Sequence, residues 1–489
     1  MVRSVMVEMP ILEILSREEI SDIHSASLEI LKRVGCKIDD AEFLDLLKSV
    51  GAEVDLKCKV AKLPESLVEE SLKKAGKVCR LYGRDSKFDV TLSGSNILGH
   101  QSEGATYTFD LETGMHRLST TNDLATFARL SECLENVNLV MCPVVPQNLP
   151  IQTRGIDAAR ICFDNTTKPC SIAGLAKGVE SYVHEMAEIV AGGPEEFRKR
   201  PIIVDVGLVP TSPLQFSSHE LHVFKEGAKQ GLLSSVGSMP QAGGTAPITL
   251  AGTLVIQIAE ILMGIVLGQL VNPGLAMYAL IRAGMIDPRS GAFSSGATEV
   301  ALLQTAAAQV CIDKYGLCVD TGWAASDSKL MDEQVGYEKA FSWLESGLVG
   351  ASMVSGMGAL ETGITQSPAQ LLIDDEIIQM VKRNVRGIRV DAERLALDVI
   401  ENIGIGGTFL GAKHTLDHLT ELSMPKLSDR FTRTTWQKNG ARDVILKARN
   451  RARELLKSCE IQPLSLDVRR NLDEFVSTAK AEIYRKHSH

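Results

Sequence analysis

The chain has 489 residues, of which 44% are hydrophobic and 23% charged, and Lys+Arg 52 against Asp+Glu 61 leave a net charge of -9. This hydrophobicity is too high, and the net charge per residue too low, for a disordered chain, so a large folded core is expected. The acidic balance also argues against a nucleic-acid binder, whose surface is normally basic.

The cysteines and the apolar segments bear on where the protein works. Ten cysteines are scattered without any CxxC pair, which predicts reduced thiols in the cytoplasm rather than the disulfide framework of a short secreted domain. The first twenty residues carry acids where a secretory signal needs an uninterrupted apolar stretch. Residues 250–271 approach the length of a membrane span, but Gln257, Glu260 and Gln269 interrupt them and are costly in lipid. We therefore predict a buried helix there, and a soluble protein with no membrane partner.

The first 121 residues predict a small α+β unit. Ser16 or Ser21 caps a helical pattern that runs to about residue 34, and Pro64 opens a second helical pattern that runs to residue 75. Alternating runs then indicate short strands that end in a hairpin. These strands are expected at 77–82, 88–92, 105–109 and 115–118.

From about residue 122, short apolar runs alternate with longer helical patterns. This alternation implies a parallel sheet, and eight runs over about 250 residues match an α/β fold of the closed (β/α)₈ TIM barrel type, with an open doubly wound sheet as the rival. We divide the chain into an N-terminal α+β cap (1–121), a barrel (122–375) and a charged helical C-terminal region (376–489). The expected strands are 137–145, 169–173, 202–209, 232–238, 275–280, 317–321, 351–355 and 369–373. The expected helices are 153–163, 179–191, 218–230, 296–314 and 337–346, followed by 391–400 and 442–456.

Glycine clusters resemble nucleotide-binding loops, and histidine pairs resemble metal sites. The glycine-rich runs at 237–252, 356–358 and 404–407 lack the full pattern of a nucleotide loop, so barrel loops explain them better. His414 and His418 are four residues apart and His219 and His222 three apart, but a catalytic zinc site usually needs a third protein ligand. No metal site is predicted.

The densest polar constellation covers residues 320–338. It starts where the sixth barrel strand should end, which places it on the active face of a barrel. Trp323, one of only three tryptophans, lies there beside several carboxylates, and aromatic faces attract quaternary ammonium groups. The alternative is a solvated loop that caps a helix. A second polar cluster, HQSEGATY at 100–107, precedes the hairpin, and its alternative is an ordinary turn.

Three long segments resemble the trimethylamine methyltransferase family: GHQSEGATYTFDLETGMHRLSTTNDL at 99–124, DTGWAASDSKLMDEQVGYEK at 320–339, and FLGAKHTLDHLTELSMPKLSDR at 409–430. The resemblance implies a (β/α)₈ barrel that transfers methyl groups from methylated amines to a corrinoid protein. Founding members of this family carry pyrrolysine, which matches Leu330 or Met331 in this sequence. Because ordinary residues stand there, the chain resembles the non-pyrrolysine members, which demethylate quaternary amines such as glycine betaine.

The chemistry favours a quaternary substrate. A quaternary ammonium already carries a neutral tertiary amine as its leaving group, so the enzyme's work is positioning, desolvation and charge control. Strong stabilisation of the ground-state cation would slow the reaction, so aromatic walls are expected rather than carboxylates in contact with the ammonium. We predict a methyltransferase that demethylates glycine betaine and passes the methyl group to Co(I) of a corrinoid protein. The same reaction on proline betaine, carnitine or γ-butyrobetaine is the alternative.

The candidate site residues fall into three groups. The cage around the ammonium is predicted from Trp323, Tyr278, Tyr107 and Phe341, with Tyr337 close behind. A betaine carboxylate is expected at His100, Gln147 or Arg282. We expect Asp327, Gln334 and Glu338 to orient the loop after the sixth strand or to take the proton of the product amine.

Two readings from other classes stay open. One is a non-catalytic betaine-binding member that docks a corrinoid protein. The other is a TIM-barrel lyase or aldolase, which would need a strand lysine or a metal cluster, whereas Lys168 precedes a strand and Lys329 sits in a loop. No cofactor is expected to bind tightly, because the corrinoid belongs to the cognate partner protein. A homo-oligomer in the strongly reducing cytoplasm of an anaerobe is expected.

Overall fold

The N-terminal residues form a small sheet with three helices. The computed structural model describes residues 12–487 except 173–177, 205–206 and 324. Helix α1 (Arg17–Arg33) starts at a capping box in which Ser16 and Glu19 satisfy each other's backbone N–H groups, as its sequence predicts. The sheet runs in the order β11-β1-β3-β2. The other elements are α2 (Ala41–Ser49), α3 (Glu65–Lys74), β1 (Cys36–Ile38), β2 (Glu53–Asp55), β3 (Val60–Lys62) and β11 (Gln215–Phe216).

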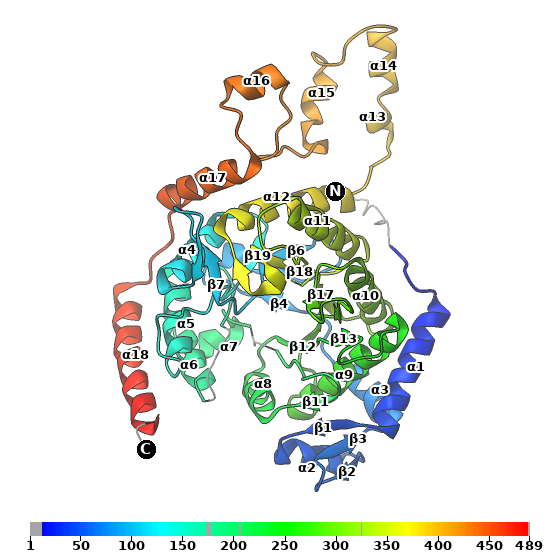
Figure 1. Cartoon of the computed structure of the whole chain (residues 1–489), viewed down its shortest axis with the longest axis vertical. Helices are drawn as coiled ribbons and strands as arrows, with labels where there is room; N and C mark the ends of the chain where they lie inside the picture. The colour runs from blue at the N-terminus through cyan, green and yellow to red at the C-terminus, as the bar shows by residue number, and fades with distance from the viewer. Residues whose placement is uncertain (1–11, 173–177, 205–206, 324, 488–489) are drawn as a thin grey trace.

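A parallel sheet of seven strands lies at the centre of the molecule, surrounded by helices (Figure 1). Its order is β10-β9-β6-β18-β17-β14-β12, and every neighbouring pair is parallel. The strands are β6 (Leu98–Gln101), β9 (Val137–Met141), β10 (Cys170–Ser171), β12 (Ser234–Ser238), β14 (Met277–Ile281), β17 (Cys318–Thr321) and β18 (Met353–Met357).

The segment 202–208 hydrogen-bonds to both edges of this curled sheet. On one side Val204 N–H donates to Cys170 O (2.9 Å), and on the other Leu208 N–H donates to Ser235 O (2.9 Å). Isolated parallel bridges at Ile203 and Leu208 accompany these bonds. The predicted strand at 202–209 therefore pairs in part with β10 and with β12, although Asp205 and Val206 lie outside the described residues.

Nine helices of the described residues follow the strands and cover the outside of the sheet (Figure 1). Six of them lie where the 3.6-residue pattern predicts a helix, and two of these, at 218–230 and 250–271, match the predicted bounds. The helices at 121–133, 194–199 and 368–385 were not predicted. The nine are α4 (Thr121–Cys133), α5 (Arg154–Asn165), α6 (Glu180–Ala191), α7 (Pro194–Lys199), α8 (Ser218–Gln230), α9 (Leu250–Val271), α10 (Thr298–Gln309, extended by a π-helical turn Val310–Lys314), α11 (Glu333–Leu348) and α12 (Pro368–Val385).

Two sequence predictions about these elements have clear outcomes. The prediction that residues 250–271 form a buried helix is confirmed: α9 alone among the described helices is long and apolar enough to cross a membrane, and 72% of its most apolar stretch is buried. The prediction of a strand at 369–373 is wrong, because these residues lie inside α12, with Pro368 in its first turn. β6, from the range assigned to the N-terminal cap, lies between β9 and β18.

Short strands stand at both ends of the central sheet. β4 and β5 precede β6, and Leu81 of β4 and Leu92, which directly follows β5, join the apolar cluster inside the sheet. The predicted hairpin β7/β8 joins β19 and β20, and because these strands follow the carboxyl ends of β6 and β18, they lie over that end. The bounds are β4 (Arg80–Leu81), β5 (Val90–Thr91), β7 (Tyr107–Phe109), β8 (His116–Leu118), β13 (Gln241–Ala242), β15 (Gly284–Ile286), β16 (Phe293–Ser294), β19 (Ala359–Leu360) and β20 (Thr365–Gln366).

The C-terminal region is helical, as predicted, and part of it projects from the body (Figure 1). The predicted helix at 391–400 is divided, because Ala396 takes a left-handed conformation with φ 53°. A disulfide joins Cys133 of α4 to Cys459, so the prediction of reduced thiols is wrong for these two residues. The helices are α13 (Ala392–Leu395), α14 (Leu397–Ile403), α15 (Lys413–Asp417), α16 (Arg433–Lys438), α17 (Val444–Ser458) and α18 (Leu466–His487).

Candidate functional site

The inside of the central sheet changes from apolar to polar along the strands. Asp320 of β17 shares one row across the sheet with Leu280, Met353 and Leu98. Apolar side chains of this row and the rows below it form a single buried cluster, which β4 and β5 close at the amino end. Polar side chains begin at Asp320 and continue at the carboxyl ends of the strands. Loops after parallel strands usually hold the site in such folds, so we place the candidate site there.

One buried carboxylate organises this polar end. Asp320 is 1% exposed, and its Oδ2 accepts hydrogen bonds from His100 Nε2 (2.9 Å) and Arg282 Nη2 (2.7 Å). His100 Nδ1 faces the carbonyl oxygen of Gln101 at 2.7 Å. Both imidazole nitrogens therefore face oxygen atoms of the protein. The network joins Asp320 of β17 to His100 of β6 and to Arg282, which directly follows β14.

The carboxyl groups at this end differ in their affinity for a proton. Burial opposes the ionisation of Asp320, but the charges of Arg282 and His100 overcome it and lower its pKa to about 2. Glu103 follows β6, and burial raises its pKa to about 7 against the lowering effect of the same two cations. Its Oε2 atom is shielded from solvent and has no hydrogen-bond partner. Perturbed pairs of this kind are typical of functional sites.

Several buried polar atoms around this network also lack partners. They come from three strands of the central sheet (β10, β17 and β18) and from β20, next to Ser102, whose hydroxyl Gln366 Nε2 contacts at 2.9 Å. Buried polar atoms are normally satisfied by protein or water, so this end of the interior suits a small polar ligand or ordered water. The atoms are Asp320 Oδ1, Ser171 Oγ, Ser355 Oγ and Gln366 Oε1.

Of the predicted site residues, the structure brings His100, Arg282 and Tyr278 into this end of the sheet. Tyr278 is buried in β14, two residues before the row of Asp320, and burial raises the pKa of its phenol. Gln147 is partly buried, and its Nε2 donates to Val145 O (2.6 Å), so its side chain serves its own loop. Glu103 and Asp320 were not among the predicted site residues, although both lie in the polar clusters that the sequence points out.

The loop after β17 is held by the acidic residues expected to orient it. Asp327 accepts from Ser295 N–H (2.8 Å), Gly296 N–H (3.2 Å) and the Ser294 hydroxyl. Glu338 accepts from Asp327 N–H (3.0 Å) and from Gln334 Nε2 (2.8 Å). These bonds join the loop to β16 and to α11.

The aromatic residues predicted as one cage lie in separate places. Tyr107 stacks on His116 (ring centroids 4.8 Å apart), and Trp323 lies near Phe293 (6.2 Å). Tyr337 and Phe341 line an open pocket of about 450 Å³ between α10 and α11, together with Glu338. No ring contact among the described residues joins these aromatic groups to Tyr278, so the cage residues lie in separate places.

The two residues that match pyrrolysine lie in the loop before α11. Leu330 is 60% exposed. Met331 is partly buried, and its sulfur lies 3.1 Å from the Ser367 hydroxyl. The segment between Asp327 and α11 thus contacts the start of α12 through Met331, whereas Leu330 is exposed.

The remaining sequence candidates have structural partners. His414 and His418 stack on each other (4.1 Å), and His222 pairs with Glu180 (2.9 Å). Among the described residues no group of three or more His, Cys, Asp or Glu side chains could hold a metal ion. Lys168 donates to three carbonyl oxygens at 2.6–2.7 Å at the amino end of the sheet, and Lys329 donates to Asp327 O (2.7 Å). A buried pair that the sequence did not predict, Lys339 with Asp374 (2.6 Å), joins α11 to α12.

Comparison with known proteins gives one consistent family. The model of the trimethylamine methyltransferase (MTTB) family matches residues 1–484. The chain is 34% identical over 471 residues to trimethylamine methyltransferase MttB of Desulfitobacterium hafniense, covering 96% of this chain and 94% of the relative. It is 30% identical over 480 residues to a glycine betaine methyltransferase of the same species, covering 97% and 98%. Among solved structures, the hydroxylamine MtmB complex matches with a TM-score of 0.51 at 12% identity, covering 91% of this chain and 94% of that one.

Proposed function

The chain belongs to the trimethylamine methyltransferase family and is a corrinoid-dependent methyltransferase, and we propose that it demethylates a quaternary amine that carries a carboxylate, with glycine betaine first among the candidates. Proline betaine, carnitine and γ-butyrobetaine share the same two charges and are the alternatives. The relatives named for trimethylamine and for glycine betaine differ little in identity to this chain, so the choice of substrate rests on the site.

The observation that carries this proposal is the charge balance at Asp320. His100 and Arg282 both bond to one oxygen of a single carboxylate. With the His100 ring protonated, as the proposal requires, two positive groups face one negative group. Glu103 adds no charge while it is protonated. A substrate carboxylate would complete the balance, and guanidinium and imidazolium groups are strong partners for carboxylates. A bare methylammonium would instead add a third positive charge.

The family's chemistry sets the task of the protein. The corrinoid, carried by a separate protein, supplies a Co(I) nucleophile for the methyl group. A sheet curled around its own side chains leaves room inside for a small ligand rather than for a corrin ring, so the unpartnered polar atoms fit the amine substrate. We therefore assign the corrinoid to the partner, which approaches from the carboxyl ends of the strands.

The chain's own residues bind, orient and handle one proton. Arg282 and His100 hold the substrate carboxylate, so that the ammonium end points toward the open end of the sheet. When the methyl group leaves, the amine nitrogen regains its lone pair and becomes basic. Glu103, with a pKa near 7, gives its proton to that nitrogen, becomes a carboxylate, and so lets the product leave as a zwitterion. Asp327, Gln334 and Glu338 keep the loop after β17 in place during this step.

Three further parts of the proposal concern the frame. We propose that segment 202–208 completes an eight-stranded barrel, supported by its bonds to β10 and β12. The division into a cap (1–121), a barrel (122–375) and a helical region (376–489) stays a prediction, with β6 crossing from the first part into the sheet. Function in the cytoplasm, where strong reductants keep Co(I) available, is the setting we propose.

The test uses the purified full-length chain with cobalamin reduced to Co(I) under anoxic conditions. The visible spectrum reports methylation of the cobalt while glycine betaine, proline betaine, carnitine and trimethylamine are offered in turn. We expect methylation with a betaine and none with trimethylamine. Methylation with trimethylamine alone, or with none of them even when a cognate corrinoid protein is added, would refute the proposed substrate.

A further inference from the structure

We propose that residues 388–431, here called the arm, form the interface with a second copy of this chain. The arm follows α12 and projects beyond the body of the molecule, carrying α13, α14 and α15 (Figure 1). The inference rests on exposure, area and charge in this segment, and it is independent of the proposed substrate.

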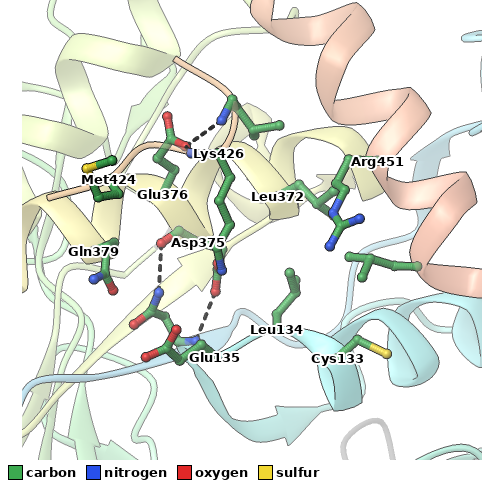
Figure 2. A pocket seen from close by; sticks show the side chains of 13 residues that line it. Cys133, Leu134, Glu135, Leu372, Asp375, Glu376, Gln379, Met424, Lys426 and Arg451 are labelled. Carbon is green, nitrogen blue, oxygen red and sulfur yellow. Dashed lines mark hydrogen bonds between the residues drawn. The ribbon is translucent and has the colours of Figure 1, made fainter. Parts of the chain in front are cut away.

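The arm is anchored firmly at its return to the body. Glu376 of α12 accepts hydrogen bonds from the backbone N–H groups of Lys426 (2.6 Å), Leu427 (2.7 Å) and Ser428 (2.8 Å). Figure 2 shows Glu376 beside Lys426, with Met424 at the rim of the pocket that these residues line. Leu427 is the one large apolar side chain of the arm that is buried among the described residues.

Beyond this anchor, the arm exposes large apolar side chains. Of the 30 large hydrophobic residues that are exposed in the described chain, 13 lie between residues 388 and 431. None of the helices α13, α14, α15 and α16 has a buried residue. Helices of four to seven residues are not stable in water by themselves, so they need packing against another surface. The body of the chain does not supply that surface.

The area of the exposed groups is that of a stable interface. Ile405 is 110% exposed, Leu410 85% and Ile388 83%. Taking about 200 Å² for a fully exposed large side chain, the thirteen residues present on the order of 1,500 Å² of mostly apolar surface. The largest apolar patch on a typical monomer is roughly 300–600 Å², and a standard interface needs about 800 Å² from each partner. The arm therefore exceeds what a monomer tolerates and suffices for a dimer.

Charge and position favour a second copy over another partner. The chain has a net charge of -9, but the arm holds seven acidic and five basic side chains, a net charge of only -2, so two arms meet with little repulsion. The position of the arm points the same way. Helix α12 begins beside the carboxyl end of β18, where Asp374 accepts from Gly358 N–H (2.6 Å), and then runs back along the sheet. The arm starts where α12 ends. It therefore leaves the body at the end opposite to the candidate site. A corrinoid protein that must reach the site has no need of this surface, whereas a symmetric pair of arms covers itself.

The experiment measures the mass of the full-length chain in solution by light scattering and sedimentation velocity, at about 1 to 50 µM. We expect at least twice the chain mass of 53.0 kDa. The double variant Ile405→Asp/Leu410→Asp changes two side chains that are exposed in the single chain, so it should fold while its dimer dissociation constant rises by at least about 100-fold. The matched control, Leu56→Asp/Val78→Asp, changes two exposed apolar residues of the N-terminal unit and should leave the mass unchanged.

Three results would overturn the inference. The first is a wild-type chain that stays at 53.0 kDa over the whole range. The second is an arm variant whose association is unchanged, with its far-ultraviolet circular dichroism confirming the fold. The third is a monomer that uses the arm to bind the corrinoid protein, seen as loss of that complex in the arm variant.

Discussion

Asp320→Asn is the substitution that tests the candidate site most directly. The change keeps the shape of a side chain that is 1% exposed, but removes the charge that two cations share. Removing one partner of a buried ion pair costs about 3–5 kcal/mol, because the other charge stays buried without compensation. Part of that cost is relieved if His100 loses its proton, so the free energy of unfolding should fall by about 3 kcal/mol.

The effect on catalysis follows from the same bonds. His100 and Arg282 lie at 2.9 and 2.7 Å from Asp320 Oδ2, which fixes the positions of both cations. If the loss of this positioning removes about 3 kcal/mol of transition-state stabilisation, kcat/KM falls about 100-fold. The assay is the anoxic methylation of cobalamin by glycine betaine, run where circular dichroism shows the variant to be folded.

A matched control separates this effect from instability. Lys168 lies at the opposite end of the sheet, where its ammonium group satisfies three carbonyl oxygens. Lys168→Met leaves these acceptors unpaired at about 1–3 kcal/mol each, and so destabilises the fold at least as much as Asp320→Asn does. We expect its kcat/KM to stay within about twofold of the wild type. Equal losses of activity in the two variants, or full activity of folded Asp320→Asn, would refute the reasoning.

Three other predictions test separate parts of the site. Burial raises the pKa of Glu103 to about 7, so between about pH 4.5 and 7 the unfolded chain binds fewer protons than the folded chain, and the stability of the fold decreases as the pH rises through that range. Because Glu103 loses its proton there, kcat/KM should fall above about pH 7, and the variant Glu103→Gln should be slower but independent of pH. A variant whose pH profile keeps the wild-type midpoint would contradict this role. Arg282→Met should lower kcat/KM for glycine betaine about 100-fold, since a charge-assisted bond is lost. Demethylation of tetramethylammonium, which has no carboxylate, should stay at its low wild-type rate. Equal losses with both substrates would show that Arg282 has only a structural role. Asp327→Asn weakens the three bonds that tie the loop after β17 to residues 294–296, so it should raise KM several-fold with a small change in the melting temperature. An unchanged KM would show that the loop has no part in binding.

The sequence predicted the frame well where the signal was local. The capping box at Ser16 and the patterns of α8 and α9 depend on residues within one helix, so they can be read directly. The strand at 369–373 failed because a short apolar run does not distinguish a buried strand from a buried helix. β6 was overlooked as a strand of the sheet because its neighbours, β9 and β18, are distant in sequence.

The site residues stay predictions, but their places in the fold can be compared with what the sequence indicates. His100, Arg282 and Tyr278 follow from their places on strands, because the carboxyl ends of parallel strands meet at one end of the sheet. The aromatic residues chosen for the cage lie apart, because residue type says nothing of partners: Tyr107 stacks on His116, and Trp323 lies near Phe293. The altered pKa of Glu103 depends on burial by distant segments, which no local pattern reports. The disulfide between Cys133 and Cys459 joins residues 326 positions apart, beyond any spacing rule.

The separate aromatic residues and the paired cations together suggest how such a site could bind tightly and still react. The methyl group leaves a nitrogen that loses its positive charge, so any group that stabilises the ammonium in the ground state raises the barrier. Affinity has to come from a part of the substrate whose charge does not change. The carboxylate of a betaine is such a part, and in the proposed site its partners are His100 and Arg282, both of which bond to Asp320. Binding energy at the carboxylate can then orient the methyl group without stabilising the charge that must disappear.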